Sequence, residues 1–251
     1  MPPFGMHMTL ARELASQVSH RAPLEHPGAY YLGATAPDIR AMTGWDRAQT
    51  HFFNLDEFGH QRGVAGLFEA HAELASHGDL GDTTVAFLLG YISHLEMDET
   101  WICDVYRPCF GERSPLKGDM LANLLDRILQ FELDRQGRCD AGAVDDIRGA
   151  LSAYELVDVE TGLVDRDTLT RWRDVLIEVL GRTLEWERFG RTASRHLKAY
   201  GVESEADLAH FMSNIPDLLD QSVREVTPER LASFQERARD RALEAIREYL
   251  S

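Results

Sequence analysis

The stretch DTTVAFLLGYISHLEMDETWICDVY, residues 82–106, decides the fold of this 251-residue chain. Its apolar side chains fall on nearly every side of a helix, and a helix that is apolar all round is buried inside its domain. An Asp-Thr pair at its start supplies a helix cap. We therefore expect a long central helix over residues 82–106, with other helices packed around it.

Apolar residues recur at helical spacing along nearly the whole chain, and alternating runs bounded by hairpin turns are missing. The pattern predicts an all-α fold, a single multi-helix domain over residues 1–251. Besides the central helix, we expect helices over residues 9–20 (capped by Thr9), 28–37, 61–77, 115–136, 141–151, 167–200, 204–223 and 227–250. Residues 38–59 have no clear period and are expected to form a loop packed onto the body.

Composition excludes several classes of function. The chain has 42 acidic and 26 basic residues and a formal net charge of −16, so nucleic-acid binding is not expected. The longest apolar run is too short to cross a bilayer, and no signal-peptide pattern opens the chain, which predicts a cytoplasmic protein without stable membrane insertion. Three cysteines, Cys103, Cys109 and Cys139, favour neither a disulfide framework nor a cysteine-rich zinc site.

The central helix carries a histidine and an aspartate four residues apart, His94 and Asp98. Such a pair lies on one helix face, about 6 Å apart along the axis, so one metal ion can contact both side chains. Burying an ionised aspartate without a partner costs several kcal/mol, so something cationic has to meet Asp98. A histidine–aspartate hydrogen bond or a buried aspartate–arginine pair would also satisfy it. Glu99 points about 100° away and could at most orient a ligand.

Three more residues could join this pair. Asp38 follows Pro37, where the chain turns and the carboxylate can be aimed inward; a simple turn cap is the alternative. His51 lies among aromatic residues and could equally stack in a loop. His7 lies between two methionines just ahead of the first expected helix, where a lone histidine is often incidental. His71 could supply a further metal ligand, in place of one that the chain lacks, or be an ordinary core histidine.

Together, these segments resemble the zinc-dependent phospholipase C family, whose all-helical fold is shared with single-strand-specific nucleases. The resemblance is carried by His7, YLGATAPDIR (residues 31–40), THF (residues 50–52) and FLLGYISHLEMDE (residues 87–99). The last is the most specific, because the family places a buried histidine and an aspartate four apart after such an apolar Gly-Tyr run. The resemblance implies five metal ligands: His7, Asp38, His51, His94 and Asp98.

The chain departs from the secreted bacterial members of that family. They use the amino group of a mature N-terminal tryptophan as a ligand, and they complete a three-zinc cluster with a later histidine and a His-xxx-Glu pair. Here the later histidines are His196 and His210, followed four residues on by Tyr200 and Asn214. A third metal site is therefore not supported by the sequence, and the residues up to 106 carry the ligands while residues 107–251 complete the helical body.

Nitrogen and oxygen ligands suit zinc, and also iron or manganese. The resemblance favours zinc, and we expect two ions that activate a water and stabilise a phosphoryl transition state. Asp38 is the expected bridging ligand or general base. The predicted function is a metal-dependent hydrolase of a phosphoester or phosphodiester, acting on a small-molecule or lipid substrate. An iron-dependent non-hydrolytic enzyme of the di-iron oxygenase type and a non-catalytic protein with a structural metal are the alternatives.

Overall fold

A computed structural model describes residues 2–55, 58, 62–156, 159, 161–192, 197–198 and 200–251. These residues form helices and connecting turns, with no β-strand among them, so the predicted all-α fold is confirmed. The helices are α1 (Phe4–Ala15), α2 (Ala22–Glu25), α3 (Pro27–Gly33), α4 (Arg40–Thr43), α5 (Ala48–His51), α6 (Gly63–Ala70), α7 (Asp82–Trp101), α8 (Arg107–Cys109), α9 (Met120–Gly137), α10 (Ala141–Ala153), α11 (Arg166–Leu180), α12 (Trp186–Thr192), α14 (Glu205–Ser213), α15 (Ile215–Val226) and α16 (Pro228–Tyr249).

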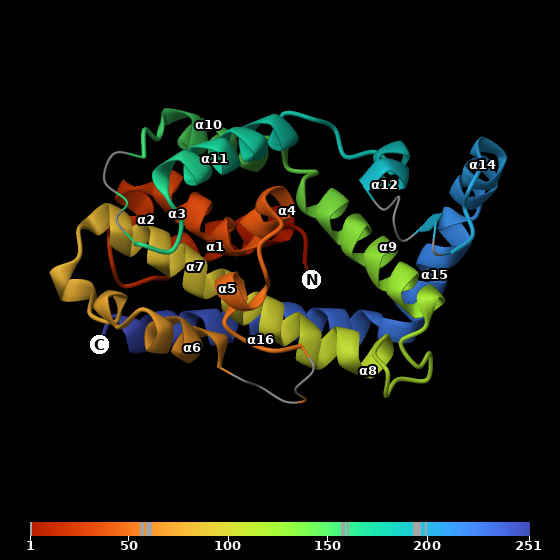
Figure 1. The fold of residues 1–251 in the computed structure, drawn as a ribbon, viewed down its shortest axis with the longest axis horizontal. Helices are drawn as coiled ribbons and strands as arrows, with labels where there is room; N and C mark the ends of the chain where they lie inside the picture. Colours follow the sequence, from red (N-terminus) through yellow and green to blue (C-terminus); the bar gives the residue numbers. More distant parts are fainter. Residues whose placement is uncertain are drawn as a thin grey trace.

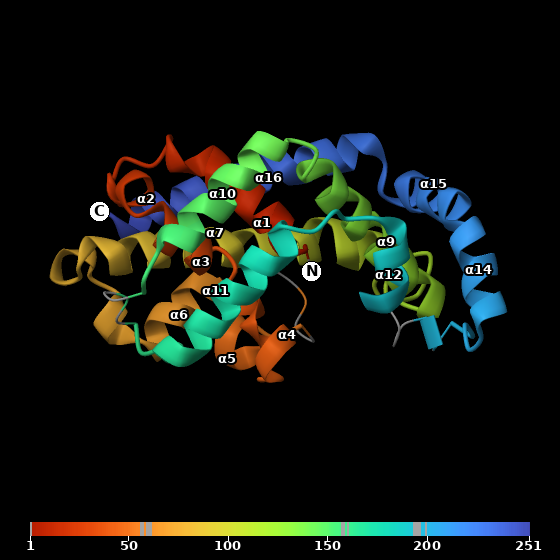
Figure 2. The ribbon, with the colours of Figure 1, turned by 90° about the horizontal axis from the view of Figure 1, so that it is seen from above.

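Helix α7 is the predicted central helix. It runs through the middle of the molecule, between α1 and α3 on one side and α16 on the other (Figure 1). Every residue from Thr83 to Trp101 is buried, and a single π-helical turn, Ile102–Tyr106, continues it toward α8. A view from above shows α10 and α11 beside α3, with α14 and α15 at the other end of the molecule (Figure 2). The rest of the fold is thus arranged around α7.

Two glycines let α3 and α7 approach each other closely. A β-carbon on Gly33 would collide with the backbone carbonyl of Phe87, and one on Gly90 would collide with the carbonyl of Tyr30. Glycine is the residue that permits such backbone-to-backbone packing. The close crossing matters for function because it fixes the position of Ala34, the residue directly after α3.

Buried apolar side chains form two clusters. The larger one surrounds α7, and the smaller one joins α9, α12, α14 and α15. The smaller cluster consists of Leu124, Ile128, Phe189, Leu197, Phe211 and Ile215. All three cysteines are free, as expected. Among the described residues, no helix combines the length and apolar character needed to cross a membrane. The expected cytoplasmic location and single-domain boundaries stay predictions.

The first helix begins earlier than predicted. It starts at Phe4, immediately after Pro3, and therefore contains His7 instead of following it. Thr9 does not cap the helix; its hydroxyl donates to the carbonyl of Gly5 from within it, 3.0 Å away. The prediction failed because Thr9 has a typical capping side chain, whereas the preceding residues Gly5–Met8 are helical and buried in the core.

Other predicted boundaries were also wrong. The helix expected over residues 167–200 is interrupted at residues 181–185, where Gly181 and Thr183 have low helix propensity. The helix expected over residues 204–223 divides at Asn214, because Pro216 belongs to the first turn of a new helix and cannot continue an old one.

Two further segments differ locally from expectation. Residues 38–59 contain the short helices α4 and α5 within the expected loop. In the helix expected over residues 61–77, α6 ends at Ala70 and two 3₁₀ turns follow, Ala72–Leu74 and His77–Asp79. Short turns of this kind carry too few residues to show a period in the sequence.

The α3–α7 crossing can be tested with one methyl group. Gly33→Ala should lower the free energy of unfolding by about 2 kcal/mol or more, because overpacking a closely packed core is destabilising. Gly149→Ala on α10 is the matched control, since no atom lies within 4 Å of its added β-carbon. The control should be neutral or slightly more stable. Urea denaturation measures the free energy of unfolding of both variants. Equal values would contradict the close backbone approach of α3 and α7.

Candidate metal centre

Five side chains from four segments converge beside the middle of α7. His7 comes from α1, Asp38 from the 3₁₀ turn Ala36–Ile39, His51 from the end of α5, and His94 and Asp98 from α7 itself. They form two overlapping triads that could each hold a metal ion, His7–His94–Asp98 and Asp38–His51–His94. The structure therefore brings together all five residues singled out in the sequence.

The distances between these donor atoms are those of a coordination shell. The Nε2 atom of His51 lies 3.1 Å from Asp98 Oδ2, 3.4 Å from His94 Nε2 and 3.8 Å from Asp38 Oδ1. His7 Nε2 lies 3.4 Å from Asp98 Oδ1. Ligand atoms placed tetrahedrally about a zinc ion are about 3.3 Å apart, given metal–nitrogen distances of about 2.0 Å. The cluster is thus compact enough for one ion to contact several of its members.

His94 is held in a defined orientation by the backbone. Its Nδ1 atom lies 2.9 Å from the carbonyl oxygen of Ala34. A carbonyl oxygen can only accept, so Nδ1 carries the ring proton and the lone pair on Nε2 faces the cluster. The partner carbonyl is fixed by the close packing of Gly33 on α7. The α3–α7 crossing therefore sets the tautomer of a candidate ligand.

His51 is oriented by the turn that carries it. The hydroxyl oxygen of Thr50 lies 2.9 Å from His51 Nδ1 and 3.4 Å from the carbonyl oxygen of Arg47. The Tyr91 hydroxyl on α7 donates to the Thr50 carbonyl. Phe52 then takes a left-handed conformation, φ 56°, which is uncommon for a bulky side chain and turns the chain sharply after His51. These contacts direct Nε2 toward the cluster.

Arg47 places a permanent positive charge within the centre. Its Nη2 atom donates to Asp98 Oδ2 at 2.8 Å, and its side chain is only 10% exposed. The guanidinium also lies over the ring of Phe53, 4.7 Å from the centroid. The sequence predicted that a cation must meet Asp98, and the aspartate–arginine pair left open as an alternative is present. No spacing rule links residues 47 and 98, so the sequence did not single out Arg47.

The ring nitrogens of His7 have no hydrogen-bond partner among the described residues. Its ring stacks on that of His94 with centroids 3.7 Å apart, and both of its nitrogens are buried without a hydrogen-bond partner among the described residues. The Oδ1 atom of Asp98, which faces His7, is likewise unpartnered there. Buried polar atoms nearly always have hydrogen-bond partners, and a bound ion is a recognised reason for an exception. The donor set and its unpartnered atoms therefore fit a divalent metal ion.

Burial and neighbouring charges keep His51, His94 and Asp98 in the protonation states that bind metal. Burial, together with the neighbouring His7 ring, holds the pKa of His94 well below its usual value, and burial also lowers the pKa of His51. Burial alone would raise the pKa of Asp98, but the charge of Arg47 and the contact with His51 hold it well below the usual value. His51 and His94 are thus neutral and Asp98 is ionised at neutral pH, as metal coordination requires.

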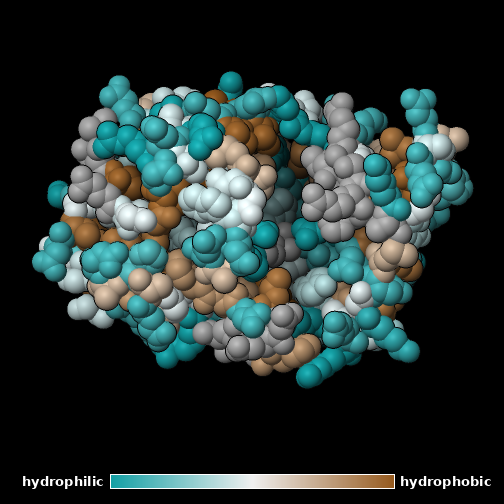
Figure 3. Space-filling view, viewed as in Figure 1, coloured by the Kyte–Doolittle hydropathy of each residue, from teal (hydrophilic) through white to brown (hydrophobic). Residues whose placement is uncertain are grey.

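Asp38 differs from the other four residues in its access to solvent. Its side chain is 15% exposed, whereas those of His7, His51, His94 and Asp98 are 0% exposed. Burial and the charge of Asp98 raise the pKa of Asp38. The molecular surface is hollowed beside α4, which begins two residues after Asp38 (Figure 3). Asp38 is therefore the member of the cluster best placed to meet a molecule arriving from outside.

Other candidates from the sequence lie outside the cluster. Glu99 accepts from the backbone amides of Arg62 and Gly63, in keeping with its expected orientation away from His94. His71 directly follows α6 and lies 3.4 Å from the carboxylate of exposed Glu73, outside the five-residue cluster. His210 lies exposed on α14, and His196 falls outside the described residues.

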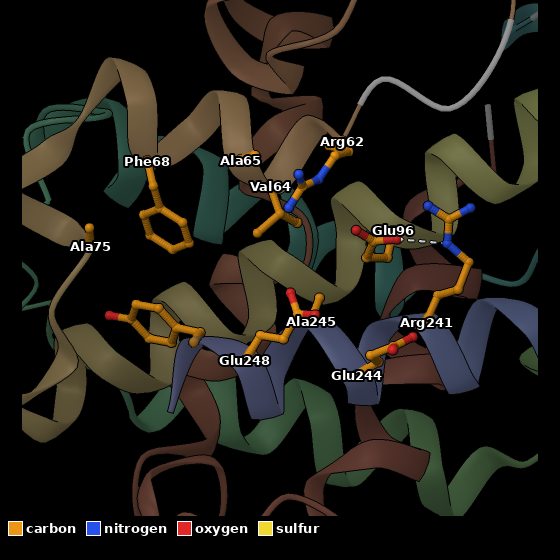
Figure 4. Close-up of a pocket in the computed structure, with 11 residues that line it drawn as sticks. Arg62, Val64, Ala65, Phe68, Ala75, Glu96, Arg241, Glu244, Ala245 and Glu248 are labelled. Atoms are coloured by element: carbon orange, nitrogen blue, oxygen red, sulfur yellow. Dashed lines mark hydrogen bonds and ion pairs between the residues drawn. The ribbon is translucent and has the colours of Figure 1, made fainter. Parts of the chain in front are cut away.

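The opposite side of α7 faces a different environment. There a cavity of 560 Å³ lies between α6, α7 and α16. Figure 4 shows Glu96 of α7 pointing toward Arg241 of α16, and their side-chain atoms lie 3.0 Å apart. Arg241 is 25% exposed, so this ion pair contacts water in a way that the Arg47–Asp98 pair does not. A buried ion pair, Arg47–Asp98, can therefore be compared with a partly exposed one, Arg241–Glu96, on the same helix.

Comparison with known families agrees with this geometry. Residues 6–101 match the family model described as zinc dependent phospholipase C. The resemblance inferred from the sequence is thereby confirmed for this part of the chain. The match begins just before His7 and ends shortly after Asp98, so it contains all five clustered residues. No curated protein and no solved structure matches the chain.

The buried ion pair at the centre can be tested without any metal. In chelator-treated protein, Asp98→Asn should lower the free energy of unfolding by about 3 kcal/mol or more, because it leaves the buried Arg47 guanidinium without its carboxylate. Glu96→Gln, the control on the other face of α7, should cost under about 1 kcal/mol because Arg241 can turn toward water. Urea midpoints compare the two. A larger loss in Glu96→Gln than in Asp98→Asn would refute this account of the pair.

Proposed function

We propose that the chain is a metal-dependent phosphoric ester hydrolase that uses zinc. The observation that carries the proposal is the meeting of three imidazoles and two carboxylates at one buried point. There His7 Nε2 and Asp98 Oδ1 lie 3.4 Å apart, and neither has a hydrogen-bond partner among the described residues. The family match over residues 6–101 supports zinc and phosphoester chemistry. In this proposal His7, Asp38, His51, His94 and Asp98 are the ligand set.

A bound divalent ion would lower the pKa of a water molecule and stabilise negative charge on phosphoryl oxygens. The residues of the chain prepare the site for this role. The Ala34 carbonyl and the Thr50 hydroxyl hold the rings of His94 and His51 in place, which limits reorganisation during the reaction. The surrounding core excludes water from all of the cluster except its Asp38 side.

Asp38 is proposed as the general base. A base has to reach the water that attacks phosphorus, and the Asp38 carboxylate is the partly exposed group of the cluster. It lies 3.8 Å from His51, so it remains within the same constellation as the ligands. In this role Asp38 would accept a proton of the attacking water as the new phosphorus–oxygen bond forms and the ester phosphorus–oxygen bond breaks, and the leaving alkoxide would take up a proton from solvent.

The proposed substrate is a phosphoester with an anionic phosphoryl group, either a lipid headgroup or a smaller soluble diester. The chain as a whole is acidic, with a formal net charge of −16, and would repel such a substrate at long range. A divalent ion bound at the centre would reverse that field locally. Hydrolysis of a soluble chromogenic phosphodiester, compared with phosphatidylcholine vesicles, distinguishes the two substrate sources.

Metal binding is tested first. His94→Ala should remove most of the zinc found in protein purified without chelator or a metal-affinity tag, because His94 belongs to both candidate triads. His71→Ala is the control and should keep the parent's metal content, since its imidazole lies outside the cluster. Elemental analysis gives the readout. Full zinc occupancy in His94→Ala would overturn the ligand assignment.

The catalytic role of Asp38 is tested separately. Asp38→Asn should lower kcat for a chromogenic phosphodiester by about 100-fold or more, the usual contribution of a general base, while the free energy of unfolding stays near that of the parent. Asp145→Asn, an exposed substitution on α10, should leave kcat unchanged. Parent-like kcat in Asp38→Asn would exclude it as the base. A protein that consumes oxygen with bound iron and hydrolyses no phosphoester would instead favour the oxygenase alternative.

A further inference from the structure

Arg47 is paired with one of the two carboxylate oxygens that Asp98 could offer to metal ions. Its Nη2 atom donates to Asp98 Oδ2 at 2.8 Å. The same oxygen lies 3.1 Å from His51 Nε2 and 3.9 Å from His94 Nε2. The guanidinium of Arg47 therefore brings a cation directly to this carboxylate. The other oxygen of Asp98, Oδ1, lies 3.4 Å from His7 Nε2 and has no hydrogen-bond partner among the described residues.

The ligands cannot easily be shared between two ions. Paired metal ions in hydrolases lie about 3.5–4 Å apart, so ligands that contact both are needed to hold them. His94 belongs to both triads but has one free nitrogen, because Nδ1 is bonded to the Ala34 carbonyl. Asp98 has one free oxygen, because Oδ2 is paired with Arg47. His94 and Asp98 therefore each offer one uncommitted donor atom. Asp38, the bridging ligand expected from the sequence, belongs to the triad with His51 and not to the triad with His7.

Charge leads to the same conclusion. Metal coordination requires neutral imidazoles and ionised carboxylates, so in a metal-bound centre Asp38, Asp98 and Arg47 together contribute one net negative charge. One divalent ion makes the buried centre singly positive, and a second would make it triply positive. Uncompensated charge in a site whose ligands are almost fully buried is costly, so a second ion is strongly disfavoured.

Arg47 is also built into the fold as a fixed group. It immediately precedes α5, its side chain is packed against the face of Phe53, and its carbonyl oxygen accepts from Thr50 beside His51. Its Nε and Nη1 atoms are buried without partners among the described residues. The guanidinium is therefore held beside Asp98 by packing on one side and by the ion pair on the other.

We propose that the centre binds a single divalent ion and that Arg47 supplies, as a fixed cation, the positive charge that a second ion would otherwise bring. The inference rests on the proposed metal binding and replaces the two ions expected from the sequence with one. Arg47 thus sets the metal stoichiometry of the centre without being a ligand.

The test is a zinc titration of chelator-treated protein, with the number of ions counted by native mass spectrometry and elemental analysis. The parent should bind one equivalent. Arg47→Met frees Asp98 Oδ2 and removes the cation, so it should bind two. Arg47→Lys, which keeps the charge, should bind one, and so should Arg241→Met, which removes an arginine from the Glu96 pair on the opposite face of α7.

Two equivalents in the parent, or one equivalent in a folded Arg47→Met, would overturn the single-ion inference while leaving the proposed function intact. No zinc uptake by any of the proteins would overturn both. Should Arg47→Met fail to fold, electron paramagnetic resonance of the parent loaded with Mn²⁺ decides the question alone. An isolated six-line spectrum is expected, and a spin-coupled pair would refute the inference.

Discussion

The Asp98 carboxylate has no access to water, and the local structure depends on the way its charge is balanced. A buried carboxylate needs positive charge and hydrogen-bond donors nearby, or it becomes protonated. Here Arg47 donates to one oxygen, while the other lies 3.4 Å from His7 Nε2. One aspartate thereby ties α5 and α1 to α7. Its charge is the reason that an arginine and three imidazoles gather in an otherwise apolar core.

Helix α7 serves as both the core of the fold and the base of the centre. Its buried apolar residues pack against α3 and α16, and its two clustered residues lie on one stripe between them. The packing also determines the chemistry. Because Gly33 and Gly90 allow backbone contact between α3 and α7, the Ala34 carbonyl reaches His94 and fixes its ring. A change in core packing would therefore reach the centre directly.

The described residues of the second half of the chain support the centre, and no histidine among them belongs to the cluster. Trp172 of α11 is buried and directs its indole nitrogen at the Thr35 hydroxyl, 3.3 Å away, beneath the turn that leads to Asp38. Helix α9 packs against α1, but its buried Asp134 is paired with Arg138 at 3.0 Å. These described contacts give the second half of the chain a structural role around the centre.

The sequence by itself determined the helical class, the buried central helix and the five residues that cluster, because those properties follow from local periodicity, from the four-residue spacing of His94 and Asp98 and from family motifs. Tertiary structure alone decided which cation meets Asp98, which carbonyl orients His94 and where α1 begins. Arg47 and Asp98 are 51 residues apart, and His94 and Ala34 are 60 apart. No local pattern encodes such contacts, since they arise only when packed helices bring distant segments together.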